Sequence, residues 1–131
     1  MVERTVEWKQ YEVTLTTEDT VRVRDISLNS KEQLDFRDHV VKMAMGHAHL
    51  VVATVTQCFA YRAGHWNTPV VFDLPKDGTI NLVKLSEKYI LLVDTHEGIQ
   101  IYNYEGRLVC APRLPNARVG ALNANTLALS R

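Results

Sequence analysis

Hydrophobic and polar residues alternate along most of this chain, in the pattern of half-buried β-strands. The segments "VKMAM" at 41–45 and "LVKL" at 82–85 alternate because successive side chains of a strand point to opposite faces of its sheet. Two other segments, "HLVVATV" at 49–55 and "YILLVD" at 89–94, are short continuous apolar runs, as expected for strands that are covered on both faces. The pattern predicts an all-β fold.

The sequence also repeats itself after 40 residues. Residues 40–62 align without a gap with residues 80–102, and Leu74-Pro75 aligns with Leu114-Pro115. The apolar pairs in this alignment are Val40/Ile80, Met43/Val83, Met45/Leu85, Leu50/Ile90, Val51/Leu91, Val52/Leu92, Phe59/Ile99 and Tyr61/Ile101. A period of about 40 residues with four short strands per unit is typical of β-propeller blades. We therefore predict a partial WD40-like β-propeller of about three four-stranded antiparallel blades.

The repeat divides the chain into parts of one propeller. The predicted parts are the last strands of a preceding blade at 1–37, complete blades at 38–75 and 78–115, and the start of a next blade at 116–131. In the first part we predict three strands, at about 11–16, 21–26 and 33–36. Closed propellers have about 4 to 8 blades, so we expect the chain to be a segment of a larger protein.

One segment, 31–48, allows a helical alternative. In a helix Leu34, Val41 and Met45 would form an apolar stripe. However, Leu34 alternates with Phe36 at the period of a strand, and the partner segment of the repeat, "DGTINLVKLSEK", is a poor helix former. We therefore predict strands here.

Composition narrows the possible functions. Fifteen basic residues balance fifteen acidic ones, so the chain lacks the broad positive field that nonspecific nucleic-acid binding needs. No apolar run approaches the roughly 20 residues of a transmembrane helix, and the N-terminus has no apolar secretory segment, so we expect a cytosolic protein without a transmembrane segment. The two cysteines, Cys58 and Cys110, are far apart in the sequence and predict neither a disulfide framework nor a zinc site.

Several segments are specific enough to resemble one family. They are "EQLDFRDHVVKMAMGHAHLVVATVTQC", "WNTPVVFDL", "LLVD", "YNYEGRL" and "APRLPNARVGALNANTLALS". In order and spacing they resemble the second WD-repeat propeller of the eighty-kilodalton subunit of intraflagellar transport complex B, from about Leu34 to Ser130. The chain departs from a generic WD repeat because no Trp-Asp pair closes either blade, where Phe72-Asp73 and Pro112-Arg113 stand instead.

The resemblance implies a non-enzymatic protein-interaction scaffold needed for the assembly of cilia or flagella. It further implies a location in the cilium or flagellum, the basal body and the cytoplasm. The implied partners are other subunits of complex B, with no cofactor and no small-molecule substrate. Two rival interpretations are the propeller of another coat or vesicle-trafficking complex, and a propeller enzyme or lectin with polar groups around the central channel.

The strongest interface candidates are aromatic and basic residues near the ends of predicted strands. Trp66, with Asn67 and Thr68, is predicted in the loop that enters the fourth strand of a blade, where Trp66 either anchors a partner or packs between blades. Arg107, with Arg113 and Arg118, could pair with an acidic partner or be solvated. By contrast, the alternating Phe59, Tyr61, Ile99 and Ile101 are predicted to be core residues.

Two weaker patterns suggest chemistry. His47 and His49, with His39 or His65, could chelate a metal, but no further ligand lies at a matching spacing, so we interpret them as residues of a turn. Asp94 and His96, with Ser86, could suggest a hydrolase triad. The sequence has no G-x-S-x-G segment and no Gly-rich phosphate loop, so we predict no catalytic, cofactor or metal site.

Overall fold

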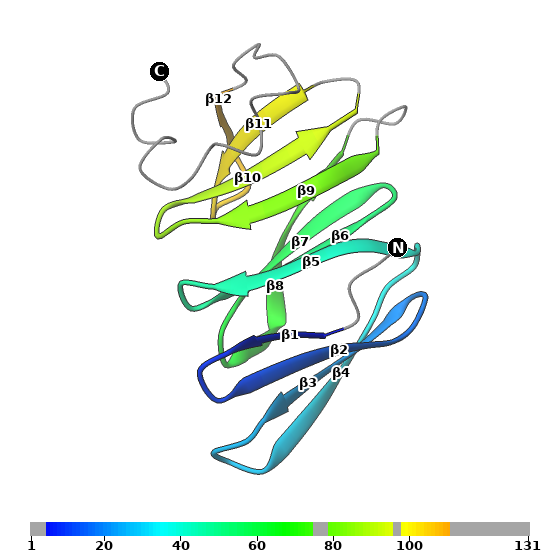
Figure 1. Ribbon diagram of the computed structural model, residues 1–131, viewed down its shortest axis with the longest axis vertical. Coiled ribbons are helices and arrows are strands. Elements are labelled where there is room, and N and C mark those ends of the chain that lie inside the picture. The colour runs from blue at the N-terminus through cyan, green and yellow to red at the C-terminus, as the bar shows by residue number, and fades with distance from the viewer. Residues whose placement is uncertain (1–4, 75–78, 96–97, 111–131) are drawn as a thin grey trace.

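The computed structural model describes residues 5–74, 79–95 and 98–110, and these form three four-stranded antiparallel sheets (Figure 1). The first sheet contains β1 (Thr5–Trp8), β2 (Tyr11–Thr17), β3 (Thr20–Asp25) and β4 (Ser30–Asp35). The second contains β5 (Val40–Gly46), β6 (His49–Thr54), β7 (Gln57–Arg62) and β8 (His65–Asp73). The third contains β9 (Ile80–Leu85), β10 (Tyr89–Asp94), β11 (Gly98–Asn103) and β12 (Leu108–Cys110). The predicted all-β fold is confirmed, and the helical alternative at 31–48 is wrong.

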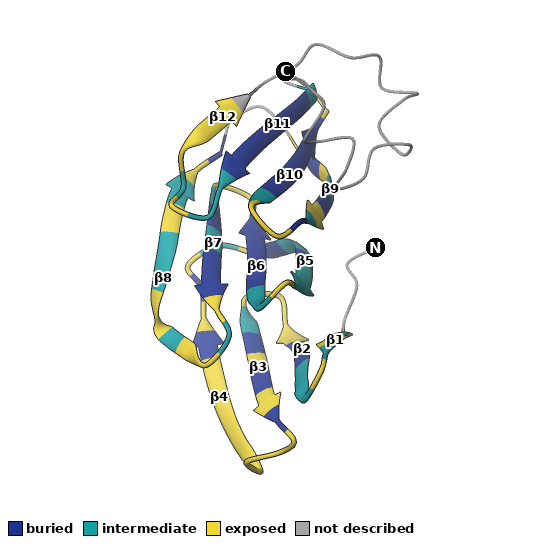
Figure 2. Cartoon of the chain, turned by 90° about the vertical axis from the view of Figure 1, so that its left-hand side faces the viewer, coloured by how far each residue is buried: buried dark blue, intermediate teal, exposed yellow. Residues whose placement is uncertain are grey.

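Each sheet is a meander in which strands that follow one another in sequence are neighbours. The first strands of the three sheets, β1, β5 and β9, lie beside one another along one edge of the stack. The fourth strands, β4, β8 and β12, form the opposite edge and carry many exposed residues (Figure 2). This is the arrangement of propeller blades, with inner strands towards the ring axis and outer strands at the rim.

The register between the first and second strands confirms the repeat that the sequence predicts. Val52 of β6 pairs with Met43, and Leu92 of β10 pairs with Val83, the residues 40 positions further on. Towards the third strand the registers differ by one residue, because Val52 pairs with Phe59 whereas Leu92 pairs with Gln100 and not with Ile99. Both strands are buried on both faces, because other sheet surfaces cover them. The four predicted core residues lie inside the stack, with Tyr61, Ile99 and Ile101 buried and Phe59 half-buried.

Two apolar layers join the sheets, and we call them the first and the second seam. The first seam lies between the first and second sheets, and its buried members are Val13, Leu15, Val21, Val23, Leu34, Phe36, Val40, Met43, Leu50, Val52 and Tyr61. The second seam lies between the second and third sheets, and its buried members are Val51, Ala53, Cys58, Ala60, Leu74, Ile80, Val83, Ile90, Leu92 and Tyr102. Burial of this apolar surface is what holds neighbouring blades together.

The first sheet differs from the prediction in three ways, one of which is that the strand predicted at about 33–36 runs from Ser30 to Asp35. It has four strands rather than three, because Thr5–Trp8 pairs with β2 as an inner strand. In addition, β3 ends at Asp25, so Ile26 lies in a turn and not in a strand. The predicted blade ends at 75 and 115, the predicted blade start at 78 and the whole predicted part 116–131 lie outside the described residues.

Candidate functional site

Trp66 lies within β8 and not in the predicted loop before it, because β8 already begins at His65. Its half-buried ring packs against the first seam. It meets Tyr11 of the first sheet edge to face, with ring centres 5.7 Å apart, and Tyr61 of its own sheet at 6.2 Å. Trp66 therefore joins two blades, and only part of its ring is accessible. Asn67 and Thr68, next to it on the outer strand, are exposed.

Arg107 lies in the turn between β11 and β12. Its backbone N–H donates to Oδ1 of Asn103 at 3.0 Å, and its carbonyl accepts from the Asn103 N–H at 3.0 Å, so the turn is closed while the Arg107 side chain is exposed. Trp66 and Arg107 belong to the corresponding parts of two successive sheets. The other two candidate arginines, Arg113 and Arg118, lie outside the described residues.

Two histidines of the metal interpretation, His47 and His49, lie at the turn between β5 and β6, whereas His39 precedes β5 and His65 begins β8. His49 Nδ1 donates to the carbonyl of His47 at 2.8 Å, and the His49 ring stacks on Tyr104 with centres 3.7 Å apart. Burial lowers the pKa of His49, and the charges of Arg62 and His47 lower it further, although the bond to His47 opposes them. Among the described residues no group of three His, Cys, Asp or Glu side chains could hold a metal ion. This His49 ring thus serves as a packing surface in the second seam.

The residues of the hydrolase interpretation are not brought together. Ser86 lies in the turn before β10, where its hydroxyl bonds the backbone of Tyr89, whereas Asp94 is the last residue of that six-residue strand. A strand rises roughly 3.3 Å per residue, so its length separates the two side chains. His96 lies outside the described residues. Ser86 and Asp94 therefore do not form a catalytic pair in the described part of the chain.

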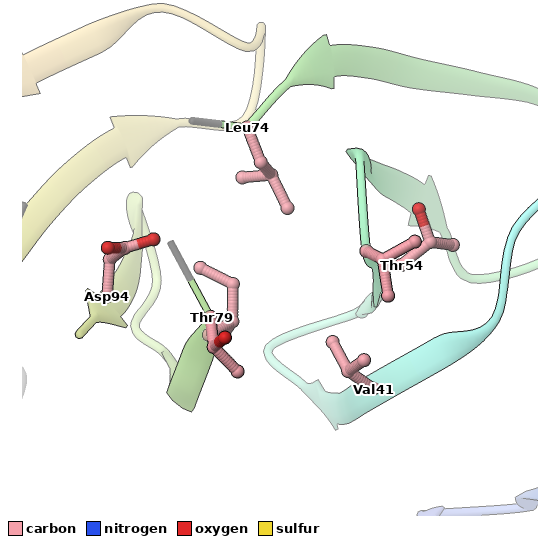
Figure 3. A pocket seen from close by; sticks show the side chains of 7 residues that line it. Val41, Thr54, Leu74, Thr79 and Asp94 are labelled. Carbon is pink, nitrogen blue, oxygen red and sulfur yellow. The ribbon is translucent and has the colours of Figure 1, made fainter. Parts of the chain in front are cut away.

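A small cavity lies in the second seam, at the Asp94 end of β10 (Figure 3). Its volume is about 40 Å³, whereas small-molecule sites enclose roughly 300–1,000 Å³. Its lining residues are Val41, Thr54, Val55, Leu74, Thr79, Ile80 and Asp94. A second, open hollow of about 660 Å³ follows the inner strands, where Thr5 and Glu7 are the polar members of a lining completed by Val6, Met43, Ala44, Met45 and Val83. Neither gives the converging polar cluster expected of a propeller enzyme or lectin.

The turns of the molecule fall on two sides. The turns β1–β2, β3–β4, β5–β6, β7–β8, β9–β10 and β11–β12 lie on the left in Figure 1, and we call this side face A. The turns β2–β3, β4–β5 and β6–β7 lie on the other side, which we call face B. Figure 2 looks onto face A. Helices long and apolar enough to cross a membrane are not found among the described residues.

Face A carries two exposed apolar residues that the sequence analysis did not single out. Ile26 is 54% exposed and Leu28 is 75% exposed, both in the β3–β4 turn. The segment "RDISLN" indicates a turn, since Asp, Ser and Asn are all residues that favour turns. Apolar residues inside a turn have no strand face to cover them.

Comparison with known proteins identifies the fold and the family. Among solved structures, the computationally designed Ika4 protein matches 88% of this chain and 79% of its own with a TM-score of 0.71 at 11% identity. The β-propeller domain of Cps50 (Swd1) from Myceliophteria thermophila matches 82% of this chain and 43% of its own, with a TM-score of 0.56 at 13% identity. At these identities the likeness concerns the fold, a β-propeller.

Sequence comparison is more specific. "Intraflagellar transport protein 80 homolog" of Rattus norvegicus and that of Mus musculus are each 45% identical to this chain over 130 residues. The alignment covers 99% of this chain and 16% of each relative, so the chain spans about a sixth of their length. A family model described as the IFT80 second β-propeller matches residues 3–131. The three sheets are thus blades of that domain, and the chain belongs to the IFT80 second β-propeller family.

Proposed function

We propose that this chain is part of a protein-interaction scaffold of intraflagellar transport complex B, which is needed for the assembly of cilia or flagella. The observation that carries the proposal is the family match over residues 3–131 together with the 45% identity to the rat and mouse relatives. The proposed partners are other subunits of the complex. The proposed location is the cilium or flagellum, with the basal body and the cytoplasm.

The geometry supports a scaffold without catalytic activity. Blades packed through two apolar seams form a rigid body whose turns offer surfaces for docking. Of the candidate catalytic residues, Ser86 bonds the backbone of its own turn, and the length of β10 separates it from Asp94. Burial also raises the pKa of the Cys58 thiol, which keeps it protonated and unreactive.

The proposed interface includes the exposed Asn67 and Thr68 beside Trp66, together with Arg107. Arg113 and Arg118 belong to the same proposal, although they lie outside the described residues. Trp66 stabilises the strand that carries this surface, because its ring packs against Tyr11 and Tyr61.

Affinity purification of the complete protein from ciliated cells, followed by mass spectrometry, tests the proposal. Other complex B subunits should be recovered with the wild-type protein. The triple variant Asn67→Asp, Thr68→Glu, Arg107→Glu should lose part of that set, because it adds negative charge to exposed positions without removing core contacts.

The matched control is Arg37→Glu, an exposed arginine on face B, which should leave recovery unchanged. If subunits of another coat or vesicle-trafficking complex are recovered instead, the assignment to complex B is wrong. If complex B is recovered equally with the triple variant, the scaffold role stands and this interface is wrong.

A further inference from the structure

The β3–β4 turn is fixed in a conformation that presents two apolar side chains to solvent. Oδ1 of the buried Asp25 accepts hydrogen bonds from the Ser27 N–H at 3.0 Å, the Ser27 hydroxyl at 2.8 Å and the Leu28 N–H at 3.1 Å. These bonds order the turn, so Ile26 and Leu28 are held in place although they are 54% and 75% exposed. An ordered, exposed apolar pair loses little conformational entropy when a partner covers it.

Aromatic side chains continue this surface towards the second sheet. The Ile26 N–H donates to the carbonyl of Gln10 at 2.8 Å, which ties the β3–β4 turn to the β1–β2 turn. There the half-buried rings of Trp8 and Tyr11 stack with centres 6.4 Å apart, and Tyr11 in turn meets Trp66. We call Trp8, Tyr11, Ile26, Leu28 and Trp66 the aromatic patch. Trp and Tyr are enriched among the residues that dominate binding energy at protein interfaces.

The exposed charges in the turns that carry the aromatic patch have one sign, whereas the adjoining strand residues Glu7 and Glu12 are acidic and Glu12 lies 3.9 Å from Arg24. In the face A turns of the first two sheets (8–11, 25–30, 46–49 and 62–66) the exposed cationic side chains are Lys9 and Arg62, joined by the titratable His47 and His65. Lys9 Nζ lies 4.9 Å from the centre of the Trp8 ring. The one carboxylate of these turns, Asp25, is buried and occupied by the bonds described above.

Face B of the same two sheets has the opposite charge. Its turns and strand ends carry the carboxylates of Glu18, Asp19, Asp35, Asp38 and Asp73 against the guanidinium of Arg37 and the His39 ring. The balanced net charge of the chain therefore conceals a separation of charge between the two faces. Such a separation selects partners and orients them as they approach.

We propose that the aromatic patch docks an acidic protein segment, one that carries at least one large apolar side chain between its carboxylates. The apolar side chain would cover Ile26 and Leu28, and the carboxylates would lie near Lys9 and Arg62. This inference rests on the proposed scaffold function and specifies the chemistry of a partner. Two lysine or arginine side chains are fewer than the clusters of about 4 to 8 that attract proteins to anionic membranes, so a protein segment fits better than a lipid surface.

Photocrosslinking in ciliated cells tests the proposal on the complete protein. Leu28→benzoylphenylalanine places a crosslinker on the patch, and Val55→benzoylphenylalanine is the matched control, because Val55 is 49% exposed in a face B turn. The crosslinked peptides are sequenced by mass spectrometry. We expect the position 28 adduct to be a segment of another polypeptide, rich in Asp and Glu and containing a large apolar residue, and we expect position 55 not to capture it.

The affinity of the recovered segment, made as a labelled peptide, then checks the chemistry by fluorescence anisotropy. Replacing its carboxylates by amides should weaken binding by about 10-fold or more, as should the double variant Ile26→Ser, Leu28→Ser or the double variant Lys9→Glu, Arg62→Glu. The controls Val55→Ser and Arg37→Glu on face B should stay within about twofold of wild type. All these positions are exposed, so the variants should fold, and their hydrogen exchange verifies it.

Several outcomes would overturn the docking proposal. They are a neutral or basic segment at position 28, a segment of the same polypeptide or of a second copy, an adduct only with lipid, or no adduct. Binding to phosphatidylserine vesicles that depends on Leu28, without a peptide adduct, would also overturn it. If complex B subunits are still recovered in these cases, the docking proposal fails while the scaffold function stands. If they are not recovered at all, the scaffold function fails.

Discussion

The two seams solve the same packing problem with different side chains. In the first two sheets the second strand begins with a ring that meets the next sheet: Tyr11 begins β2 and His49 begins β6. At the first seam Tyr11 meets the edge of Trp66 on β8, at 5.7 Å. At the second seam His49 stacks on Tyr104 in the β11–β12 turn, at 3.7 Å. Both joints are aromatic, but the ring of the later sheet comes from a different position of the repeat.

The reason lies at the position that the repeat aligns with Trp66, which is Gly106. The Gly106 backbone, with φ of +86°, comes so close to β8 that a Cβ atom there would lie 2.9 Å from Cγ1 of Val70. Backbone therefore takes the place that a Trp ring occupies at the first seam, and Tyr104, two residues earlier, supplies the ring. The repeat therefore fixes the spacing of the blades, while either neighbouring sheet can supply the side chains that fill the space between them.

The largest effect should come from filling that close approach. Gly106→Ala places a methyl group 2.9 Å from Val70 and 3.4 Å from Phe72, at a φ that disfavours any Cβ. We expect the local free energy of unfolding at the second seam to fall by about 3 kcal/mol, combining backbone strain with overpacking. Hydrogen exchange of the β6 and β10 amides in the complete protein measures it.

Gly64 offers a control with nearly the same backbone. Its φ is +87°, in the matching turn of the second sheet, but the nearest atom to a Cβ there is Oη of Tyr11 at 3.8 Å. Gly64→Ala should therefore cost only the backbone strain, about 1 to 2 kcal/mol. Equal losses in the two variants would show that the close approach at Gly106 does not tighten the second seam.

At the first seam, Trp66→Ala should remove the ring that bridges Tyr11 and Tyr61. Because Trp66 is only half-buried, we expect a loss of about 2 kcal/mol, below the roughly 3–5 kcal/mol of a fully buried aromatic residue. Exchange of the β2 and β7 amides should accelerate, while that of β10 should not. Trp66→Phe keeps a ring in the joint and should lose less than half as much; acceleration in all three sheets alike would refute a local role.

A smaller effect is expected from one hydroxyl at the second seam. Tyr104 Oη donates to the carbonyl of the buried Ser86 at 2.6 Å, so Tyr104→Phe keeps the ring on His49 but leaves that carbonyl without this partner. We expect a loss of about 1 kcal/mol in the protection of β9 and β10 amides. Tyr61→Phe is the control, since the Tyr61 hydroxyl has no hydrogen bond within the described residues, although burial raises its pKa to about 12. If Tyr104→Phe left the protection of the β9 and β10 amides unchanged, the stacking on His49 alone would hold the ring in place.

The features that the sequence predicted are those that blade packing makes periodic. Apolar pairs such as Val52 and Leu92 recur after 40 residues because they fill corresponding layers between sheets, Val52 in the first seam and Leu92 in the second. The inner strand Thr5–Trp8 was missed although Val6 and Trp8 alternate with polar residues, because the stretch is short and has no copy in register with the repeat. Short alternating segments carry too little signal when they stand alone.

The candidate site was less predictable for a physical reason. Whether Trp66 faces solvent or a seam depends on where β2 of another sheet places Tyr11, and no local pattern in the sequence contains that distance. Likewise, three donors of its own turn bond one carboxylate oxygen of the buried Asp25. The turn conformation that these bonds fix leaves Ile26 and Leu28 exposed to solvent. Apolar residues at a turn are visible in the sequence, but their exposure follows from the turn geometry.

The smallest expected effect is a difference between the two seams in how their stability depends on pH. His49 has a lowered pKa, chiefly through burial, so near its ordinary value of about 6.5 the unfolded chain binds a proton that the folded second seam does not. Stability at the second seam should therefore be complete above that value and decline as the pH falls through it. The first seam, where Tyr11 and Trp66 occupy the joint, should change less.

Exchange measured at about pH 7.5 and pH 5.5, expressed as free energies of opening, checks this difference between seams. In His49→Phe, which keeps a flat ring against Tyr104, the additional loss at the second seam should disappear. His47 and Arg62 are the charged neighbours that disfavour protonation of His49, and Arg62→Gln should reduce the acid sensitivity without abolishing it, because burial is the larger cause. An acid response of equal size at both seams would assign it to the other histidines and carboxylates, and His49 would then be a packing ring whose protonation has no consequence for the joint.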